Sequence, residues 1–240
     1  MNRLEKGGSM IDFHSHVLPG IDDGSRSAEE SLRMLAASAE QGIAYMAATP
    51  HFYPSETSPE QFLERRNRAA EHLRAVWRPE LPRLLLGAEV YYCDGISQAE
   101  EVDALRIEGT SLLLLEMPFQ TWSDRMAAEI RALQERPGCT VMLAHIERYL
   151  RLQKRPVWEN LLEAGVLMQS NASFFLGWST RHRAVQMLDA GRIHLLGSDC
   201  HNMAQRPPRV GEALAQIGER RARLLERRCR TLLEPEEAVV

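Results

Sequence analysis

Two histidines separated by a single residue, His14 and His16, follow a short apolar run near the start of this sequence. Asp199 and His201 have the same spacing after another apolar run near the other end. In an extended strand, residues i and i+2 point to the same side, so each pair can present two side chains to one cavity. Imidazole nitrogens and carboxylate oxygens together suit Mn, Fe, Zn or Mg. Both pairs therefore predict a metal site.

Other residues of the same types also follow apolar runs. They are Asp23, His51, Glu89, Glu116 and His145. A lone buried histidine is usually a packing residue, but coincidence does not account for nine such residues at the ends of six predicted strands, because buried charges need partners or metals. Nine ligands exceed the needs of one ion, and a carboxylate such as Glu89 can bridge two. His72, His182 and His194 fall outside this pattern and are expected on the surface or in packing.

Short apolar runs alternate with longer amphipathic stretches along the chain. The apolar runs predict strands over Ile11–Phe13, Tyr45–Thr49, Arg83–Ala88, Ser111–Leu115, Thr140–Ala144, Leu167–Ser170 and Ile193–Gly197. The amphipathic stretches predict helices from Ser27 toward Gly42 and over Pro59–Trp77, Ile96–Leu105, Ser123–Glu135, Val157–Ala164, Thr180–Asp189 and Arg209–Arg228. Several of the strands are apolar without alternation, as strands covered on both faces should be.

Seven consecutive strand–helix units indicate a parallel α/β sheet, most economically a single-domain, TIM-like (β/α)7 barrel. A doubly wound open sheet is the alternative. In a barrel, the C-terminal ends of the strands form the rim at which active sites of this architecture lie. Every ligand-type residue described above falls at this rim, so we expect them to build one site.

The composition is that of a globular protein without a strong charge bias. Hydrophobic residues make up 44% of the 240 residues, and the net charge of −4 gives no reason to expect nucleic-acid binding or membrane affinity. No apolar run approaches the ~20 residues that cross a bilayer, and residues 1–9 lack the apolar stretch of a signal peptide. Four scattered cysteines indicate reduced thiols in a cytoplasmic protein. We expect a flexible extension over residues 1–9, a barrel over 10–230 and a tail over 231–240.

Two arginines, Arg148 and Arg206, stand a few residues after ligand-type residues on the same predicted rim. The guanidinium fork matches phosphate oxygens, so we expect a phosphoesterase in which both arginines contact phosphate. The stretch from Cys200 to Arg206 also has the C-x5-R spacing of cysteine-dependent tyrosine phosphatases. However, an aspartate and not a histidine precedes Cys200, and the loop has no glycine for a tight phosphate cradle, so a thiolate mechanism is disfavoured.

The motifs around these residues resemble those of the PHP (polymerase and histidinol phosphatase) domain. Within that group, they are most similar to the bacterial manganese-dependent protein-tyrosine phosphatases of capsular and exopolysaccharide loci, the CpsB/YwqE type. The motifs run in order from Met10 to about Arg228. They are MIDFHSH (10–16), LPGIDDG (18–24), ATPH (48–51), GAE (87–89), LEMPF (115–119), AHIERY (144–149) and SDCHN (198–202).

The resemblance implies a distorted barrel with a trinuclear metal site. Carried over by motif, the metal ligands would be His14, His16, Asp23, His51, Glu89, Glu116, His145, Asp199 and His201, and Arg148 and Arg206 would hold the phosphate. The implied substrate is the phosphorylated, tyrosine-rich tail of a membrane-associated tyrosine kinase that controls polysaccharide export. Ile146 stands where many relatives have proline, and the loop Phe52–Pro59 and the tail after Arg228 diverge.

A mechanism follows from this assignment. Two metal ions, most simply Mn, would share a water and lower its pKa, giving a hydroxide in line with phosphorus, while the ions and both arginines neutralise the phosphoryl oxygens. A tyrosinate leaves more easily than an alkoxide because its pKa is about 10, although His201 or Asp199 could still assist as a proton donor. The aromatic residues Trp178, Phe174 and Phe175, after the sixth predicted strand, either line the substrate rim or pack in the core.

Two other functions stay open at this level. One is a PHP phosphatase of a small phosphomonoester such as histidinol phosphate, or of nucleic-acid ends. The other is a non-catalytic, metal-stabilised partner of a kinase, which the complete ligand set disfavours. The arginine-rich helix over Arg209–Arg228 predicts a solvated charged face, with a minor role in attracting an acidic phosphopeptide. A homo-oligomer is compatible with the sequence, which does not determine the oligomeric state.

Overall fold

The strands of the barrel are parallel and follow the predicted apolar runs. The structure, a computed structural model, describes residues 10–233, so the predicted extension over residues 1–9 and residues 234–240 of the predicted tail lie outside it. The strands are β1 (Ile11–Ser15), β2 (Tyr45–Ala48), β3 (His51–Phe52), β4 (Arg83–Leu86), β5 (Glu89–Tyr91), β6 (Leu112–Glu116), β7 (Thr140–Leu143), β8 (Leu167–Asn171) and β9 (Leu195–Gly197). Two short strands were not predicted: β3 begins two residues after the predicted strand Tyr45–Thr49, and β5 begins directly after the predicted strand Arg83–Ala88.

The sheet closes on itself. Strands β1, β2 and β4 form one segment, and β3, β5, β6, β7, β8 and β9 follow one another in a second. The gap between β1 and β9 is closed by the amide of Asp199, which donates to the carbonyl of His14 at 2.8 Å, and by the amide of His16, which donates to the carbonyl of Cys200 at 2.9 Å. The curled parallel sheet confirms the distorted TIM-like barrel with the PHP fold, and the open-sheet alternative is wrong.

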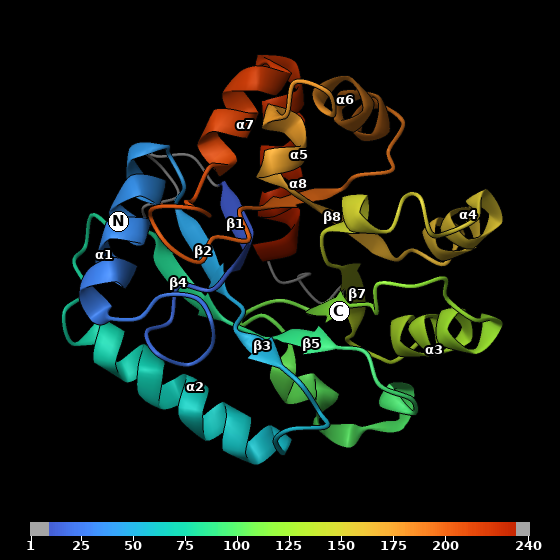
Figure 1. Cartoon of the computed structure of the whole chain (residues 1–240), viewed down its shortest axis with the longest axis horizontal. Coiled ribbons are helices and arrows are strands. Elements are labelled where there is room, and N and C mark those ends of the chain that lie inside the picture. The colour runs from blue at the N-terminus through green and yellow to red at the C-terminus, as the bar shows by residue number, and fades with distance from the viewer. Residues whose placement is uncertain (1–9, 234–240) are drawn as a thin grey trace, which may run out of the picture.

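Helices cover the outside of this sheet (Figure 1). They are α1 (Ala28–Glu40), α2 (Pro59–Arg74), α3 (Asp124–Gln134), α4 (Arg155–Glu163), α5 (Ala172–Leu176), α6 (Arg181–Asp189), α7 (Val210–Ile217) and α8 (Glu219–Leu233), together with the 3-10 turns η2 (Ile96–Gln98), η3 (Glu100–Leu105) and η4 (Ile146–Arg148). Serine side chains cap α1, α2 and α3 by accepting a hydrogen bond from an amide in the first turn. These caps fix where each rim loop ends.

Two predicted helices differ from expectation. The stretch Ile96–Leu105 forms two 3-10 turns and not an α-helix, because Ala99 between them is extended at φ −71° and ψ 122°. The predicted helix Arg209–Arg228 is split at Gly218, whose φ of +84° favours glycine, and its second half continues to Leu233, past the predicted end of the barrel at residue 230. The short helix α5 was not predicted.

The apolar strand residues form the core of the barrel. Leu112, Leu113, Leu114 and Leu115 are fully buried, as are Val141, Met142 and Leu143, which agrees with strands covered on both faces. No helix within residues 10–233 is long and apolar enough to cross a lipid bilayer. The strands thus carry their last residues to one end of a dry barrel, where polar side chains begin.

Candidate metal centre

All nine predicted ligands lie at the C-terminal ends of the strands predicted from the sequence or in the loops that follow them. His14 is in β1 and His16 follows it, His51 and Glu89 begin β3 and β5, Glu116 ends β6, His145 follows β7, and Asp23, Asp199 and His201 lie in the loops after β1 and β9. Their ligand atoms form three overlapping groups, each with its atoms within 4.8 Å of one another. The strand ends therefore bring together residues that are up to 187 positions apart in the sequence.

The innermost group contains His14, His16 and Glu89, all of them buried. The two Nε2 atoms lie 3.2 Å apart, and they lie 3.2 Å and 3.3 Å from the same oxygen of Glu89, Oε2. Ligand atoms held about 2 Å from one cation are separated by distances of this size. Three donors that face a common point deep in the barrel are suited to a single ion.

A second group lies nearer to solvent and contains His16, Asp23, His51 and His201. The Oδ1 atom of Asp23 lies 3.5 Å from Nε2 of His51 and 3.3 Å from Nε2 of His201. The Asp23 side chain is 67% exposed, whereas that of His201 is 3% exposed. This group therefore opens to the outside on its Asp23 side.

The third group contains His51, Glu89 and Glu116, with His145 beside it. The Nε2 atom of His145 lies 2.9 Å from Oε1 of Glu89 and 3.3 Å from Oε1 of Glu116. The other oxygen of Glu89, Oε2, lies 2.9 Å from Nδ1 of His51. Glu89 thus uses both carboxylate oxygens and stands at the junction of two groups, which is the position of a bridging carboxylate.

Unpartnered atoms provide a direct test of whether these residues fit metal ions. Within residues 10–233, six buried side-chain polar atoms have no hydrogen-bond partner, and four belong to predicted ligands: His51 Nδ1, Glu89 Oε2, His145 Nδ1 and His201 Nε2. The contact between His51 and Glu89 is close but lacks hydrogen-bond geometry. Leaving a polar atom buried without a partner costs about 1–3 kcal/mol. Their concentration at this end of the barrel fits a set of divalent cations.

Carboxylates in the centre raise the pKa of two of its histidines. Burial lowers the pKa of His16, but hydrogen bonds to Asp199, Asp22 and Glu89 outweigh it and hold this pKa well above its usual value of 6.5. For His145, burial again acts downward, and hydrogen bonds to Glu116 and Glu89 raise the pKa to about 9. Protons occupy these nitrogens where carboxylates surround them, and a metal ion must displace those protons to bind.

The backbone is strained at two of the ligand positions. His145 has φ +32° and Asp199 has φ +52°, and within residues 10–233 no other non-glycine residue has a positive φ. Side chains other than glycine rarely adopt this region, and such strain persists only where the surrounding structure imposes it. Its restriction to two predicted ligands marks this end of the barrel as the functional one.

The sequence analysis missed Asp22. Its Oδ2 atom lies 2.7 Å from Nδ1 of His16 and also accepts from the backbone amide of His51 at 3.1 Å. Burial acts to raise the pKa of Asp22, but the bond to His16 outweighs it and lowers this pKa to about 2, so the carboxylate is ionised and Nδ1 must donate. Nε2 is then left to face the centre. The sequence shows two adjacent aspartates and gives no means of assigning this role to the first.

Two polar residues of β8 were missed as well. The side-chain oxygen of Gln169 accepts from the amide of His145 at 2.7 Å, and Nδ2 of Asn171 donates to Oδ2 of Asp199 at 2.8 Å. These residues are two positions apart, so they point to the same side of the strand. A polar pair in alternation at the end of an apolar strand was the signal available in the sequence.

The two predicted phosphate-binding arginines both contact Asp199. Nη2 of Arg148 lies 2.8 Å from Oδ2 and Nη2 of Arg206 lies 2.6 Å from Oδ1. Their side chains are 41% and 40% exposed, whereas that of Asp199 is 4% exposed. One buried carboxylate therefore holds two guanidinium groups at the mouth of the centre.

The remaining sequence candidates lie away from the chemistry. Cys200 is fully buried, and burial raises the pKa of its thiol, so it offers no thiolate to a substrate. His72 and His182 are exposed, and His194 accepts a hydrogen bond from the amide of Met168 at 2.9 Å. These positions agree with the sequence analysis, which disfavoured a thiolate mechanism at Cys200 and left the three histidines out of the metal site.

A cavity of about 400 Å³ opens beside the second ligand group. It is lined by residues of the loops after β1 and β3, among them Asp23, His51 and Tyr53. The ring of Tyr53 stacks on that of His51, with centroids 5.3 Å apart and an interplanar angle of 26°. An aromatic wall therefore stands next to the ligand cluster.

Comparison with known proteins places this arrangement in a family. Residues 10–233 match the family model for capsular polysaccharide synthesis, CpsB/CapC. The tyrosine-protein phosphatase CpsB of Streptococcus agalactiae serotype V is 32% identical over 217 residues, which covers 85% of this chain and 88% of that protein. The tyrosine-protein phosphatase YwqE of Bacillus subtilis strain 168 is 30% identical over 213 residues, with 85% and 82% covered.

Solved structures give the same answer. The chain matches a crystal structure from the pair YwqE of Bacillus subtilis and CpsB of Streptococcus pneumoniae, described as unique metal-dependent tyrosine phosphatases, with a TM-score of 0.78, 25% identity and coverage of 93% and 94%. It also resembles the histidinol phosphate phosphatase of Lactococcus lactis, at a TM-score of 0.54, 11% identity and coverage of 92% and 94%. The second likeness shows a shared fold only.

Proposed function

This chain belongs to the CpsB/CapC family of capsular polysaccharide synthesis, and on that premise we propose that it is a metal-dependent protein-tyrosine phosphatase, a phosphoric monoester hydrolase. The observation that carries the proposal is the convergence of nine ligand-type residues into three overlapping groups with two arginines at their mouth. Relatives at about one third identity are tyrosine-protein phosphatases, and a solved structure of that type shares the fold along almost the whole chain.

The proposed metal site holds two or three divalent ions, with Mn as the first candidate and Fe, Zn or Mg as others. Its ligands are His14, His16, Asp23, His51, Glu89, Glu116, His145, Asp199 and His201. Divalent ions at such a site acidify a water molecule to give the nucleophile and neutralise charge on the phosphoryl oxygens. Support comes from the unpartnered atoms at four of these residues and from the two oxygens of Glu89, which serve two groups.

The two arginines are proposed to bind the phosphoryl group. Arg148 and Arg206 are partly exposed, so a phosphate entering the mouth meets their guanidinium groups before it reaches the buried ligands. Asp199 accepts hydrogen bonds from Arg148 and Asn171 and contacts Arg206, which keeps it ionised. We therefore assign Asp199 to positioning and metal binding and not to proton donation. His201 is assigned to metal binding because its Nε2 faces Asp23 without a hydrogen-bond partner.

The proposed substrate is phosphotyrosine in a protein. A tyrosinate with a pKa of about 10 leaves readily, so its departure asks less of a proton donor than that of an alkoxide. Following the family's association with capsule synthesis, we propose a membrane-associated tyrosine kinase of polysaccharide export as the physiological partner. The four free cysteines support a cytoplasmic setting for this reaction.

Metal-reconstituted protein tests this proposal. Purified chain should be stripped with a chelator, reloaded with Mn, and assayed on a phosphotyrosine peptide, a phosphoserine peptide and histidinol phosphate, with elemental analysis of each preparation. We expect turnover of the phosphotyrosine peptide to vanish on stripping, to return with the metal, and to exceed that of the other two substrates. Full activity in metal-free protein, or a preference for histidinol phosphate, would contradict it.

A further inference from the structure

The loops around the mouth differ in charge between the two halves of the barrel. The loops after β1, β3 and β5 carry the exposed carboxylates Asp23, Glu56 and Asp94. The loops after β6 to β9 (117–123, 144–154, 172–180 and 198–209) carry only two carboxylates, Glu147 and Asp199, and both are engaged inward. Glu147 accepts from the hydroxyl of Ser170 at 3.0 Å, and Asp199 is 3% exposed. The second half therefore presents positive charge to solvent.

Two of its basic side chains have no partner. Arg151 and Lys154 are exposed in the loop after β7, and within residues 10–233 neither forms an ion pair or a side-chain hydrogen bond. Arg148, in the same loop, points to Asp199 at the mouth. Positive charge thus continues outward from the proposed phosphate-binding arginines along one loop.

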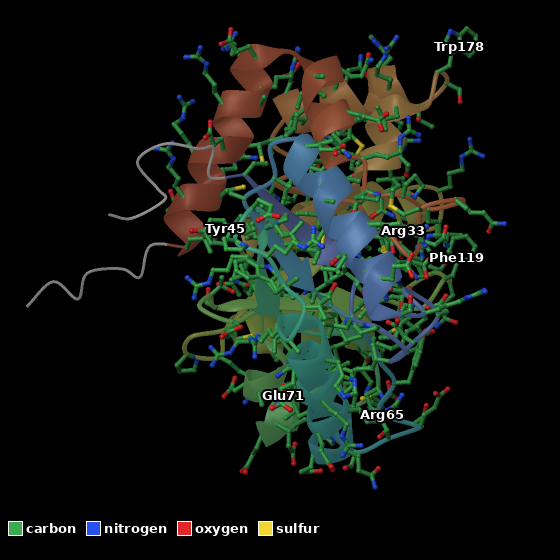
Figure 2. The ribbon with its side chains drawn as sticks, turned by 90° about the vertical axis from the view of Figure 1, so that its left-hand side faces the viewer. Arg33, Tyr45, Arg65, Glu71, Phe119 and Trp178 are labelled. Carbon is green, nitrogen blue, oxygen red and sulfur yellow. The ribbon has the colours of Figure 1, made fainter. Side chains whose placement is uncertain are left out.

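The same half exposes large apolar side chains. Within residues 10–233, four large hydrophobic residues are exposed: Val76, Phe119, Trp178 and Met203, at 44%, 74%, 93% and 36%. The last three lie in the loops after β6, β8 and β9. In Figure 2, Phe119 and Trp178 both lie on the right-hand side of the molecule, Trp178 at its upper corner and Phe119 about halfway down. Exposed aromatic side chains are available to contact a partner, since each offers a large apolar face with little conformational entropy to lose.

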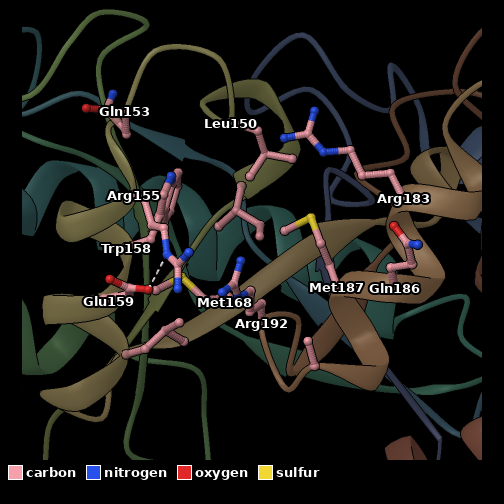
Figure 3. A pocket seen from close by; sticks show the side chains of 13 residues that line it. Leu150, Gln153, Arg155, Trp158, Glu159, Met168, Arg183, Gln186, Met187 and Arg192 are labelled. Carbon is pink, nitrogen blue, oxygen red and sulfur yellow. Dashed lines mark hydrogen bonds and ion pairs between the residues drawn. The ribbon is translucent and has the colours of Figure 1, made fainter.

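The loop after β7 also contributes to a cavity on the outer side of the barrel. It has a volume of about 550 Å³ and lies between α4 and α6 (Figure 3). Ile146 and Leu150 form its inner wall, Trp158 and Met187 its apolar sides, and Arg183 and Arg192 line it without a partner among the described residues. The turn η4 separates cavity and centre, since Arg148 faces one and Ile146 the other.

A protein substrate needs a surface outside the mouth for the chain around its phosphotyrosine. The ligands of the innermost group are at most 1% exposed, so a phosphotyrosine has to enter the mouth with its ring while its flanking chain stays outside. The loops after β6 to β9 and the cavity between α4 and α6 then offer that chain apolar contacts and unpaired arginines. A concave site with arginines inside it fits a side chain better than a flat lipid surface.

We propose that these loops and this cavity form one docking surface for the polypeptide that flanks the phosphotyrosine, and that it selects acidic and apolar flanking residues. The inference rests on the proposed function, which supplies the phosphotyrosine. Charges and exposed aromatic side chains around the mouth change how fast a long substrate associates and how tightly it binds. They leave the chemistry at the phosphorus atom unchanged. A small aryl phosphate, which has no flanking chain, should be insensitive to them.

The test compares para-nitrophenyl phosphate with two phosphotyrosine peptides, one with acidic and one with basic flanks, on metal-loaded full-length protein. The variants are the pair Arg151→Glu with Lys154→Glu, the pair Phe119→Ala with Trp178→Ala, and Arg183→Glu. Matched controls away from the surface are Arg78→Glu and Val76→Ala, both at exposed positions. We expect kcat/KM for the acidic peptide to fall about tenfold in each surface variant, mainly through KM, with para-nitrophenyl phosphate changed less than about twofold.

Several outcomes would overturn the proposal. A parallel loss on both substrates would show that the residues act on the centre, and unchanged peptide kinetics would show that they do not contact substrate. Sedimentation with phosphatidylserine vesicles supplies a further check: binding that disappears in these variants while peptide kinetics stay constant would assign the surface to a membrane. If the unmodified protein turns over neither phosphotyrosine peptide, the proposed function fails first, and that result is distinct from all of these.

Discussion

The buried ligand-type side chains at the floor of the metal centre are held differently from the side chains on the loops around its mouth. We call the first set the floor and the second set the rim. Glu89 is 1% exposed and has histidine nitrogens within 3.3 Å of both its oxygens, whereas Arg151 and Lys154 are exposed and unpartnered within the described chain. Strand ends fix the floor residues in direction and depth, while loops leave the rim residues free to adapt. The floor residues should therefore determine whether any phosphoester is cleaved. The rim residues should determine which phosphoester is preferred.

The largest effect is expected at the floor, from Glu89→Gln. The change removes the charge that two ligand groups share, so both bound metal and activity should fall, with kcat down by about 10³-fold. The loss should be equal for para-nitrophenyl phosphate and for a phosphotyrosine peptide, and it is measured by steady-state kinetics with elemental analysis. Glu108→Gln, at an exposed position before β6 where the carboxylate accepts from the amide of Leu86, is the control away from the centre. If the Glu89 variant kept its full metal content and activity, the proposed ligand set would be wrong.

Arg206→Ala probes the boundary between floor and rim. The guanidinium touches Asp199 and is 40% exposed, so its loss should leave the metals in place and remove one contact to the phosphoryl group. We expect kcat/KM to fall by about 10²-fold on both substrates with metal content unchanged. Arg206→Lys should recover only part of this loss, because an ammonium group lacks the fork that matches two phosphate oxygens. A fall in bound metal would instead show that Arg206 is needed for metal binding, like the floor residues.

Asp22→Asn should produce a smaller loss that is confined to metal binding. The carboxylate fixes the Nδ1 proton of His16, so the amide should weaken metal affinity by about 10- to 100-fold and lower activity only at limiting metal. Titration of stripped protein with Mn measures the shift, and excess Mn should restore kcat. Asp94→Asn, an exposed aspartate in the loop after β5, serves as the control. If kcat stayed low at saturating Mn, Asp22 would have a role in the reaction itself.

The sequence predicted the floor well and the rim poorly, and the reason is geometric. Uninterrupted apolar runs such as Leu112–Leu115 place strand ends to within a residue or two, and parallel strands in a barrel bring all those ends to one rim. The placement of the proposed ligands at one end of the barrel therefore follows from pattern alone. The breaks between β2 and β3 and between β4 and β5 were not predicted, although they leave His51 and Glu89 paired in register across β3 and β5.

Residues that act through another side chain could not be predicted in the same way. Asp22 and Asp23 are adjacent and chemically identical, and only the folded loop shows that the first contacts Nδ1 of His16 while the second, which is 67% exposed, lies beside Nε2 of His201. Aromatic residues were equally ambiguous: Phe175 is fully buried and Trp178 is 93% exposed, three positions apart. The direction of a side chain in a loop depends on its hydrogen bonds and packing in the folded protein, which sequence periodicity does not encode.

The smallest effect is expected from Cys200→Ala, which tests whether the floor acts through metals at all. The thiol is fully buried between two proposed ligands, and burial raises its pKa, so it is protonated and out of reach of a substrate. The pairing of β1 with the segment after β9 sets the backbone here through the carbonyl of Cys200 and not through its side chain. We expect kcat/KM within about twofold of the unmodified protein on both substrates, and a stability loss of about 1 kcal/mol from the small cavity. Chelator sensitivity should be unchanged. An inactive variant with intact metal content would instead make Cys200 the nucleophile, and the separation between a metal-binding floor and a selecting rim would no longer hold.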